Sequence, residues 1–214
     1  MVKQIAARPS SLLSNYIIAL NNKSIVLLNL GRYNESLIYV TKALSIDPTD
    51  THALVNKAVA LLDLKRYTES LIYSTKALAI DPNNADALSS KGIALDHLGN
   101  YTGAIEYYDK ALAVDPKYVP ALNNKGVVLR GLGNYTGAIE YYDKALAIQS
   151  NDTYALTNKG TALEHLGNYT GAIEYYDKAL AINPKDKAAL DNKAAANEQY
   201  QKQFCSRSPY CSET

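Results

Sequence analysis

The side chains that most often perform chemistry are few in this chain and form no catalytic pattern. The chain has 214 residues, with histidines at positions 52, 97 and 165 and cysteines at positions 205 and 211. No serine lies in a nucleophile-elbow motif, and there is no phosphate-binding Gly-rich loop, no His-Glu-x-x-His and no Cys-x-x-Cys. We therefore predict no catalytic residues, no metal site and no cofactor.

Asparagine is the polar residue type whose spacing carries a signal. A row of asparagines recurs at multiples of 34 residues, and Ser90 is its one break. The row is Asn22, Asn56, Asn124, Asn158 and Asn192. Each amide offers two donors and an acceptor with two lone pairs, so such a row can hold the backbone of an extended peptide. The alternative is that these amides bond to loops of the adjacent unit and serve packing alone.

The 34-residue spacing belongs to the whole chain. Five units align without a gap: 17–50, 51–84, 85–118, 119–152 and 153–186. The last three are near-copies, because the segment 99–112 recurs unchanged at 133–146 and 167–180. A fixed period of this length marks a solenoid, in which one unit cannot bury its own apolar face and the units must stack.

Each unit reads as a pair of helices. In 85–118, Leu88, Gly92 and Leu95 recur at helical spacing until Gly99, a residue type that readily adopts the left-handed conformation at a helix end. A second apolar stripe then runs to Asp115, which precedes a proline and so leaves helical geometry. The junction at Gln149 lacks the proline, so we expect it to be looser or to continue as a longer helix.

These units resemble the tetratricopeptide repeat family. Small residues recur on the first helix and on the second, and each unit carries a turn tyrosine. The first-helix small residues are Ser24, Ala58, Gly92, Gly126 and Gly160, and the turn tyrosines are Tyr33, Tyr67, Tyr101, Tyr135 and Tyr169. The resemblance implies an all-α fold, a right-handed α-solenoid of antiparallel helix pairs that forms a superhelix.

The resemblance also divides the chain. We expect an N-terminal lead-in over 1–16, five repeats over 17–186, a capping helix over 187–203 and a flexible tail over 204–214. One departure from the family is regular: lysine replaces the usual leucine before the first-helix small residue, as at Lys57. Its stem can lie on apolar neighbours while its ammonium group reaches water.

In this family the first helices line a concave groove that binds peptides. Carried over, the groove holds the asparagine row, an aliphatic row and Arg130. The aliphatic row is Ile25, Val59, Ile93 and Val127. The groove positions together hold nine acidic and three basic residues, which favours a basic and apolar partner segment.

One known subtype of this groove is not expected here. The chaperone-tail clamp needs Lys and Arg to hold a carboxylate, and its positions in this chain carry no cation. These positions are Asn21, Ile25, Asn56, Asp86 and Ser90. We therefore predict a non-enzymatic protein-binding scaffold that does not bind acidic chaperone tails.

Net charge and hydrophobicity limit which classes of partner and location we expect for this chain. A net charge of +1 gives no basic field for nucleic acid, and no apolar run is long enough to cross a membrane or act as a signal peptide, so we expect a soluble, cytoplasmic chain. The first helix is apolar on almost all its faces, so we expect other residues to cover it. The cover could be residues 12–16 folded back over the helix, or a second copy of the chain in a homodimer through the first repeat. It could also be a larger enzyme or assembly of which this chain is the repeat region. Cys205 and Cys211 are expected to be free thiols in a frayed end, the alternatives being a small disulfide loop or a metal site.

Overall fold

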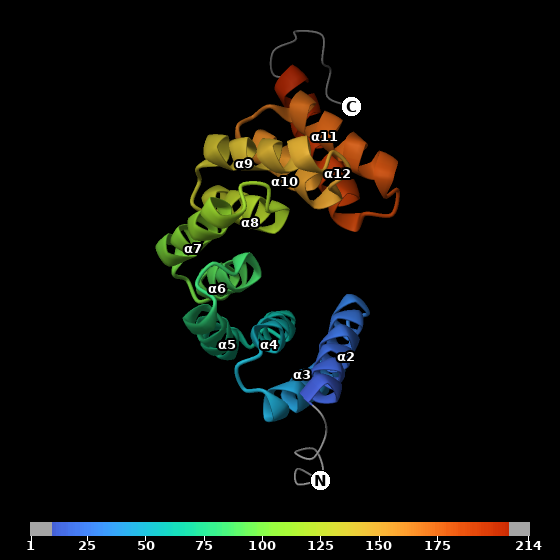
Figure 1. Ribbon diagram of the computed structural model, residues 1–214. Helices are drawn as coiled ribbons and strands as arrows, with labels where there is room; N and C mark the ends of the chain where they lie inside the picture. Colours follow the sequence, from blue (N-terminus) through green and yellow to red (C-terminus); the bar gives the residue numbers. More distant parts are fainter. Residues whose placement is uncertain (1–9, 206–214) are drawn as a thin grey trace. The chain divides into compact units, whose positions relative to one another are not determined.

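The computed structural model describes residues 10–205, and this part of the chain is helical without strands (Figure 1). The chain divides into two compact units, Met1–Pro116 and Lys117–Thr214. The helices of the first unit are α2 (Ser10–Asn29), α3 (Tyr33–Ile46), α4 (Thr51–Asp63), α5 (Tyr67–Ile80), α6 (Ala85–His97) and α7 (Tyr101–Val114). Those of the second are α8 (Val119–Gly131), α9 (Tyr135–Ile148), α10 (Thr153–His165), α11 (Tyr169–Ile182) and α12 (Lys187–Cys205).

The glycines between the helices of a pair end the first helix as predicted. Gly99 has a φ of 81°, and its N–H donates to the carbonyl of Asp96 at 2.9 Å while the N–H of Asn100 donates to that of Leu95 at 2.9 Å. This pair of bonds is a Schellman motif, which satisfies carbonyls that the helix leaves open. The Asn100 side chain then accepts from the N–H of Gly103 and caps the second helix. Lys65 takes the left-handed conformation, with a φ of 59°, in the one pair that lacks the glycine.

The junction without proline behaves like the others. Helix α9 ends at Ile148, and the N–H of Gln149 donates to the carbonyl of Ala145 at 2.9 Å, as the equivalent residue does after α5 and α7. The expectation of a longer helix is therefore wrong. Asp152 caps α10 by accepting from the N–H groups of Tyr154 and Ala155, so the next helix begins in the usual place.

Each helix pair is held together by a close crossing. In the last three repeats a fully buried tyrosine of the second helix lies against the first-helix glycine, as Tyr142 lies against Gly126. The tyrosine immediately before each of these buried residues is half-buried, so only one of each adjacent pair enters the core. In the first repeat the contact is polar, with Ser24 and Ser36 hydroxyls 2.7 Å apart.

The lysine row lies over tyrosine rings. In five repeats one tyrosine ring lies close to two ammonium groups, each at 4.2 to 5.3 Å from the ring centroid. Lys159 is largely buried, sits over Tyr175 and also pairs with Asp143. The lysines are therefore part of the packing, but the expectation that their ammonium groups simply reach water is wrong for the buried members.

The two ends extend beyond the repeats. Helix α2 begins at Ser10 and runs without a break into the first repeat, so residues 12–16 continue this helix and do not fold back over it. Helix α12 packs against α11 and α10. Residues 1–9 and 206–214 lie outside the described part of the chain, and the side chain of Cys205 lies outside it too, so the expectations for both cysteines fall there.

Candidate functional site

The predicted asparagine row lies on the first helices of the repeats, and its members differ in burial. Asn22 is exposed on α2, and Asn56 is buried on α4. Asn124, Asn158 and Asn192 are half-buried on α8, α10 and α12 of the second unit. Four of the five amides are therefore at least partly exposed, and Asn56 lies just beneath the surface.

The hydrogen bonds of this row are mostly local. Asn158 donates to the carbonyl of Tyr154 in its own helix at 2.9 Å, and Asn192 donates to the Thr161 hydroxyl of the preceding repeat at 3.3 Å. The Nδ2 atom of Asn56 is buried and has no partner in the described structure. None of the bonds in this described set joins the row to a loop of the next repeat, which was the packing alternative.

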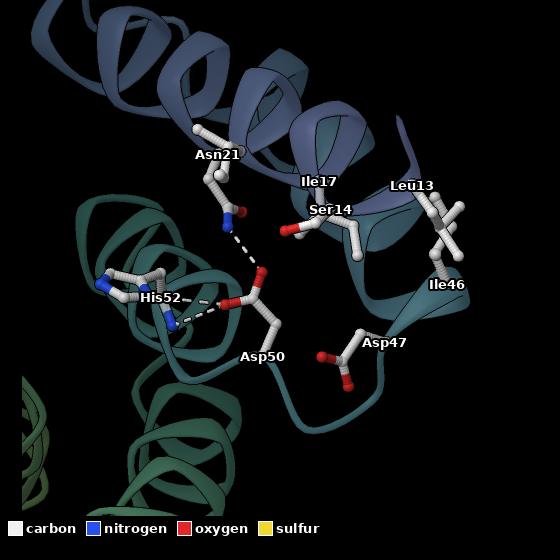
Figure 2. A pocket seen from close by; sticks show the side chains of 9 residues that line it. Leu13, Ser14, Ile17, Asn21, Ile46, Asp47, Asp50 and His52 are labelled. Atoms are coloured by element: carbon white, nitrogen blue, oxygen red, sulfur yellow. Dashed lines mark hydrogen bonds and ion pairs between the residues drawn. The ribbon is translucent and has the colours of Figure 1, made fainter. Parts of the chain in front are cut away.

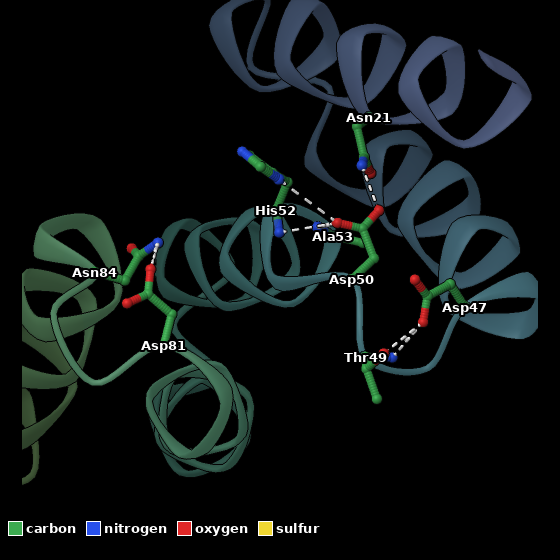
Figure 3. A network of polar contacts seen from close by, with 8 residues as sticks. All are labelled: Asn21, Asp47, Thr49, Asp50, His52, Ala53, Asp81 and Asn84. Carbon is green, nitrogen blue, oxygen red and sulfur yellow. Dashed lines mark hydrogen bonds and ion pairs between the residues drawn. The ribbon is translucent and has the colours of Figure 1, made fainter. Parts of the chain in front are cut away.

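Two other asparagines hold the repeats together. Asn21 donates to Oδ2 of Asp50 at 2.6 Å (Figure 3). Asn123 likewise donates to Oδ2 of Asp152 at 2.6 Å. Each aspartate also caps the next first helix, as Asp50 does by accepting from the N–H groups of His52 and Ala53. The packing role expected of the predicted row therefore belongs to the residue immediately before it.

A signal in the sequence could have revealed this pair. Asparagine occupies the fifth position of a unit only at Asn21 and Asn123, and aspartate ends that same unit both times. A unit with Val55 or Ser89 at that position ends in Asn84 or Tyr118 instead. The unit with Thr157 at that position also ends in an aspartate, Asp186, so the asparagine at the fifth position is the part of the pattern that marks the contact.

The members of the predicted aliphatic row differ in how exposed they are to a partner. Ile25 is 43% exposed on α2, whereas Val59, Ile93 and Val127 are half-buried. Val59 packs against the core around Leu54, and Val127 packs against the core around Tyr142. Of this row, Ile25 is therefore the member most available to a partner.

In the second unit the predicted residues meet at a cavity. Arg130 of α8, Asn158 of α10 and Asn192 of α12 line a space of about 470 Å³, together with Thr157, Thr161 and Asp186. Thr157 is 8% exposed, and its hydroxyl oxygen has no hydrogen-bond partner in the described structure. The cavity thus combines a guanidinium group, two amides, hydroxyl groups and the carboxylate of Asp186.

Two buried tyrosines lie close to Arg130. Burial raises the pKa of Tyr142 to about 12, and the nearby Arg130 guanidinium acts in the opposite direction. Burial likewise raises the pKa of Tyr176, whose hydroxyl donates to Oε2 of Glu164 at 2.9 Å. Both hydroxyls are therefore protonated at neutral pH and can act as donors.

In the first unit a second cavity lies between the two ends of the first repeat and the start of the next. It measures about 420 Å³ and is lined by aliphatic side chains, including Leu13, Ile17 and Ile46, and by Asp47 and Asp50 (Figure 2). Asn21 also lines it and is 7% exposed, with its Oδ1 atom buried and unpartnered in the described structure. The walls are apolar, and the polar groups are mainly acceptors.

No catalytic or metal-binding constellation is found in the described chain. No three histidine, cysteine or acidic side chains between residues 10 and 205 lie close enough together to hold a metal ion. His97 stacks on Tyr67 with ring centroids 4.2 Å apart, and His165 stacks on Tyr135 at 4.6 Å. These two histidines are therefore packing residues of neighbouring repeats as well as surface residues. None of the helices between those residues combines the length and apolar character of a membrane span.

Comparison with protein families identifies the chain. Tetratricopeptide repeat models match residues 17–50, 49–117, 89–153 and 153–186, which together span all five repeats. The chain therefore belongs to the tetratricopeptide repeat family, and its all-α fold of antiparallel helix pairs is that of the family's solenoids. No curated protein sequence matches it.

Solved structures share this fold at low sequence identity. A thermophilic TPR protein of Thermus thermophilus is similar with a TM-score of 0.75 and 23% identity, over 86% of this chain and 99% of that one. The pilF protein of Pseudomonas aeruginosa is similar with a TM-score of 0.73 and 22% identity, over 90% and 93%. YrrB, described as a TPR protein with an unusual peptide-binding site, is similar with a TM-score of 0.59 and 23% identity, over 82% and 90%.

Proposed function

We propose that this protein is a non-enzymatic scaffold that binds an extended segment of another protein along the faces of its first helices. The family fold supports a protein-interaction scaffold in general. The observation that carries the peptide site is the cavity of the second unit, where Arg130, Asn158 and Asn192 come from three successive first helices. All three belong to the set that the sequence pattern predicts, and all three keep polar groups at the cavity wall.

The chemistry of an extended peptide fits these groups. A peptide backbone presents donors and acceptors at regular intervals, and an asparagine amide can meet either. Thr157 and Asn56 carry buried polar atoms without partners in the described structure, and such atoms cost about 1–3 kcal/mol each when left unmet. A bound backbone would supply the missing partners.

The cavity of the first unit supports the basic and apolar character predicted for the segment. Asp47 and Asp50 lie at its wall beside the aliphatic side chains of Leu13, Ile17 and Ile46 (Figure 2). A lysine or arginine side chain offers a matching aliphatic stem and a cationic end. The carbonyl oxygen of Asn21 adds an unmet acceptor to the same wall.

A display library of random peptides tests this function. Peptides selected on the wild-type protein are measured by fluorescence polarisation against Asn124→Ala/Asn158→Ala and against the control Asn197→Ala, an exposed amide of α12. We expect the double variant to weaken binding by about 1–3 kcal/mol, from about 0.5–1.5 kcal/mol per hydrogen-bonding group, with the control unchanged. If no peptide is selected, or if all three proteins bind the selected peptides equally, the first-helix faces are not the peptide-binding site.

A second candidate function rests on the apolar surface of α2. Leu12, Ile18 and Val26 of this helix, and Leu30 directly after it, are each more than half exposed. Exposed apolar surface of this kind commonly marks a contact. The partner of α2 would be a second copy of the chain or a larger enzyme or assembly. Self-association through α2 would be supported by an apparent mass that rises with protein concentration in sedimentation analysis and that no longer rises in Val26→Glu. A monomer at all concentrations would count against self-association.

A further inference from the structure

Arg130 is a partly buried cation at the wall of a cavity that also holds the carboxylate of Asp186. Its side chain lines the cavity between α8, α10 and α12, and it forms no ion pair with a carboxylate of the described chain. Its Nε atom is buried and has no hydrogen-bond partner there. Guanidinium N–H groups are donors only, so this one requires an acceptor that residues 10–205 do not provide.

The polar groups around Arg130 are hydroxyls, which can donate, and two carboxylates, each of which accepts a hydrogen bond from another group. The Tyr142 hydroxyl is fully buried, stays protonated at neutral pH and has no partner of normal hydrogen-bond geometry in the described structure. The Thr157 hydroxyl is also buried without a partner in this part of the chain. Glu164 accepts from Tyr176 at 2.9 Å, and Oδ1 of Asp186 caps α12 by accepting from Ala189 at 3.2 Å.

The next repeat indicates what is missing. Arg130 and Glu164 occupy the same position of their units, and each stands twelve residues before the buried tyrosine of its pair. In the fifth repeat Glu164 accepts the hydroxyl proton of Tyr176, whereas in the fourth the equivalent residue is a second donor. A carboxylate beside Arg130 would therefore supply the acceptor that the neighbouring repeat builds in.

We propose that the cavity binds the carboxylate of an acidic side chain of the partner segment, which pairs with Arg130 and accepts from the Thr157 hydroxyl. This inference rests on the proposed peptide-binding function and names one requirement of the peptide. Arginine pairs with a carboxylate through two parallel hydrogen bonds, and such charge-assisted bonds are stronger than neutral ones. The volume of about 470 Å³ leaves room for the side chain and its hydration.

The position of the cavity favours a side chain within the segment over a terminal carboxylate. Asn124 and Asn192 stand on the first helices before and after α10, so the predicted backbone contacts continue on both sides of Asn158. A peptide held by all three has its backbone running past the cavity. The residue at the cavity is then an internal aspartate or glutamate.

Parallel selections from one random-peptide library test the inference. The library is displayed with blocked C-termini and is selected separately on the wild-type chain, on Arg130→Gln and on the control Lys144→Gln. Lys144 is exposed on the second helix α9, so its change removes the same charge away from the first-helix face. We expect wild type and control to enrich aspartate or glutamate at one internal position, and Arg130→Gln to lose that enrichment while keeping the rest of the selected pattern.

Affinity measurements then quantify the pairing. For the best selected peptide, replacement of the acidic residue by its amide should weaken binding to the wild type at least tenfold and to Arg130→Gln less than twofold. Thermal melting of each variant shows whether it is folded. Selected peptides without an acidic preference, or with the same preference on Arg130→Gln, overturn this inference and leave the peptide-binding function intact. If the wild type selects no peptide, the proposed function fails and this inference fails with it.

Discussion

The crossing of α8 and α9 leaves no room for a side chain at Gly126. A Cβ atom added there would lie 2.6 Å from Cε1 of Tyr142, whose ring is fully buried. The first repeat solves the same crossing differently, because Ser24 stands at the glycine position and Val40 at the tyrosine position. Substituting Gly126→Ala should therefore be unfavourable beside tyrosine and tolerated beside valine.

The size of the destabilisation follows from the overlap between the added Cβ atom and the Tyr142 ring. Carbon atoms pack at about 3.5–4.0 Å, so the added methyl group overlaps the ring by roughly 1 Å. Overpacking of this kind costs about 1–3 kcal/mol, and the gain in helix propensity from glycine to alanine returns up to about 1 kcal/mol. We expect Gly126→Ala to lower the free energy of unfolding by about 0.5–2 kcal/mol, and to raise it by about 0.5–1 kcal/mol in the Tyr142→Val background.

The assay is a double-mutant cycle by urea unfolding, followed by far-UV circular dichroism. The four proteins are the wild type, each single variant and the pair, and Gly131→Ala on the same helix serves as the control because an added Cβ there meets no atom within 4 Å. Repeat proteins can unfold in steps, so the curves are fitted with nearest-neighbour coupling between repeats. Equal effects of Gly126→Ala in both backgrounds would refute the close contact with Tyr142.

Two further predictions concern the contacts between repeats and the buried hydroxyl. Asn21→Ala should lower the free energy of unfolding by about 1–3 kcal/mol, because it removes a 2.6 Å hydrogen bond to the helix-capping Asp50. The control Asn22→Ala, at an exposed neighbour, should change the free energy of unfolding by no more than about 0.5 kcal/mol in the same urea unfolding experiments. Equal effects of the two variants would contradict the role of Asn21 in joining the repeats. The folded pKa of Tyr142, about 12, lies above the unfolded value near 10, so its contribution is complete below about pH 10 and is lost as pH rises towards 12. That loss amounts to about 2–3 kcal/mol, and Tyr142→Phe should flatten the alkaline decline in stability; an unchanged decline would place the titrating group elsewhere.

The helices were predictable because their ends are encoded locally. Gly99 and its equivalents take a conformation that other residues adopt at a cost, and the prolines after the second helices forbid their continuation. At Gln149 the proline is absent, and the helix still ends at the position equivalent to that in the other repeats. There the capping of α10 by Asp152 and the packing of neighbouring helices set the boundary, and the local pattern around Gln149 does not contain that information.

The site was predictable in its positions but not in its energetics. The repeat period places Asn158, Asn192 and Arg130 on successive first helices, and the structure brings them to one cavity. Periodicity could not distinguish Asn21 from Asn22, because both are asparagines on one helix and only packing decides which is buried. It also could not reveal that the buried Nε atom of Arg130 lacks a hydrogen-bond partner in the described structure, since that depends on the packing around the cavity.

The polar groups of the repeats differ in whether the chain itself supplies their partners. On the second helices the cations are met within the chain, as Lys144 and Lys178 are by tyrosine rings at 4.6 and 4.5 Å. On the first helices, Asn56, Arg130 and Thr157 keep buried polar atoms without partners in the described structure, and Ser70 and Tyr142 do so on second helices. Such atoms therefore do not by themselves distinguish the two helices of a pair. The first-helix faces differ because Arg130, Thr157 and Asn158 meet there at one cavity, and this convergence is the physical argument for placing a polar, chain-like partner on them.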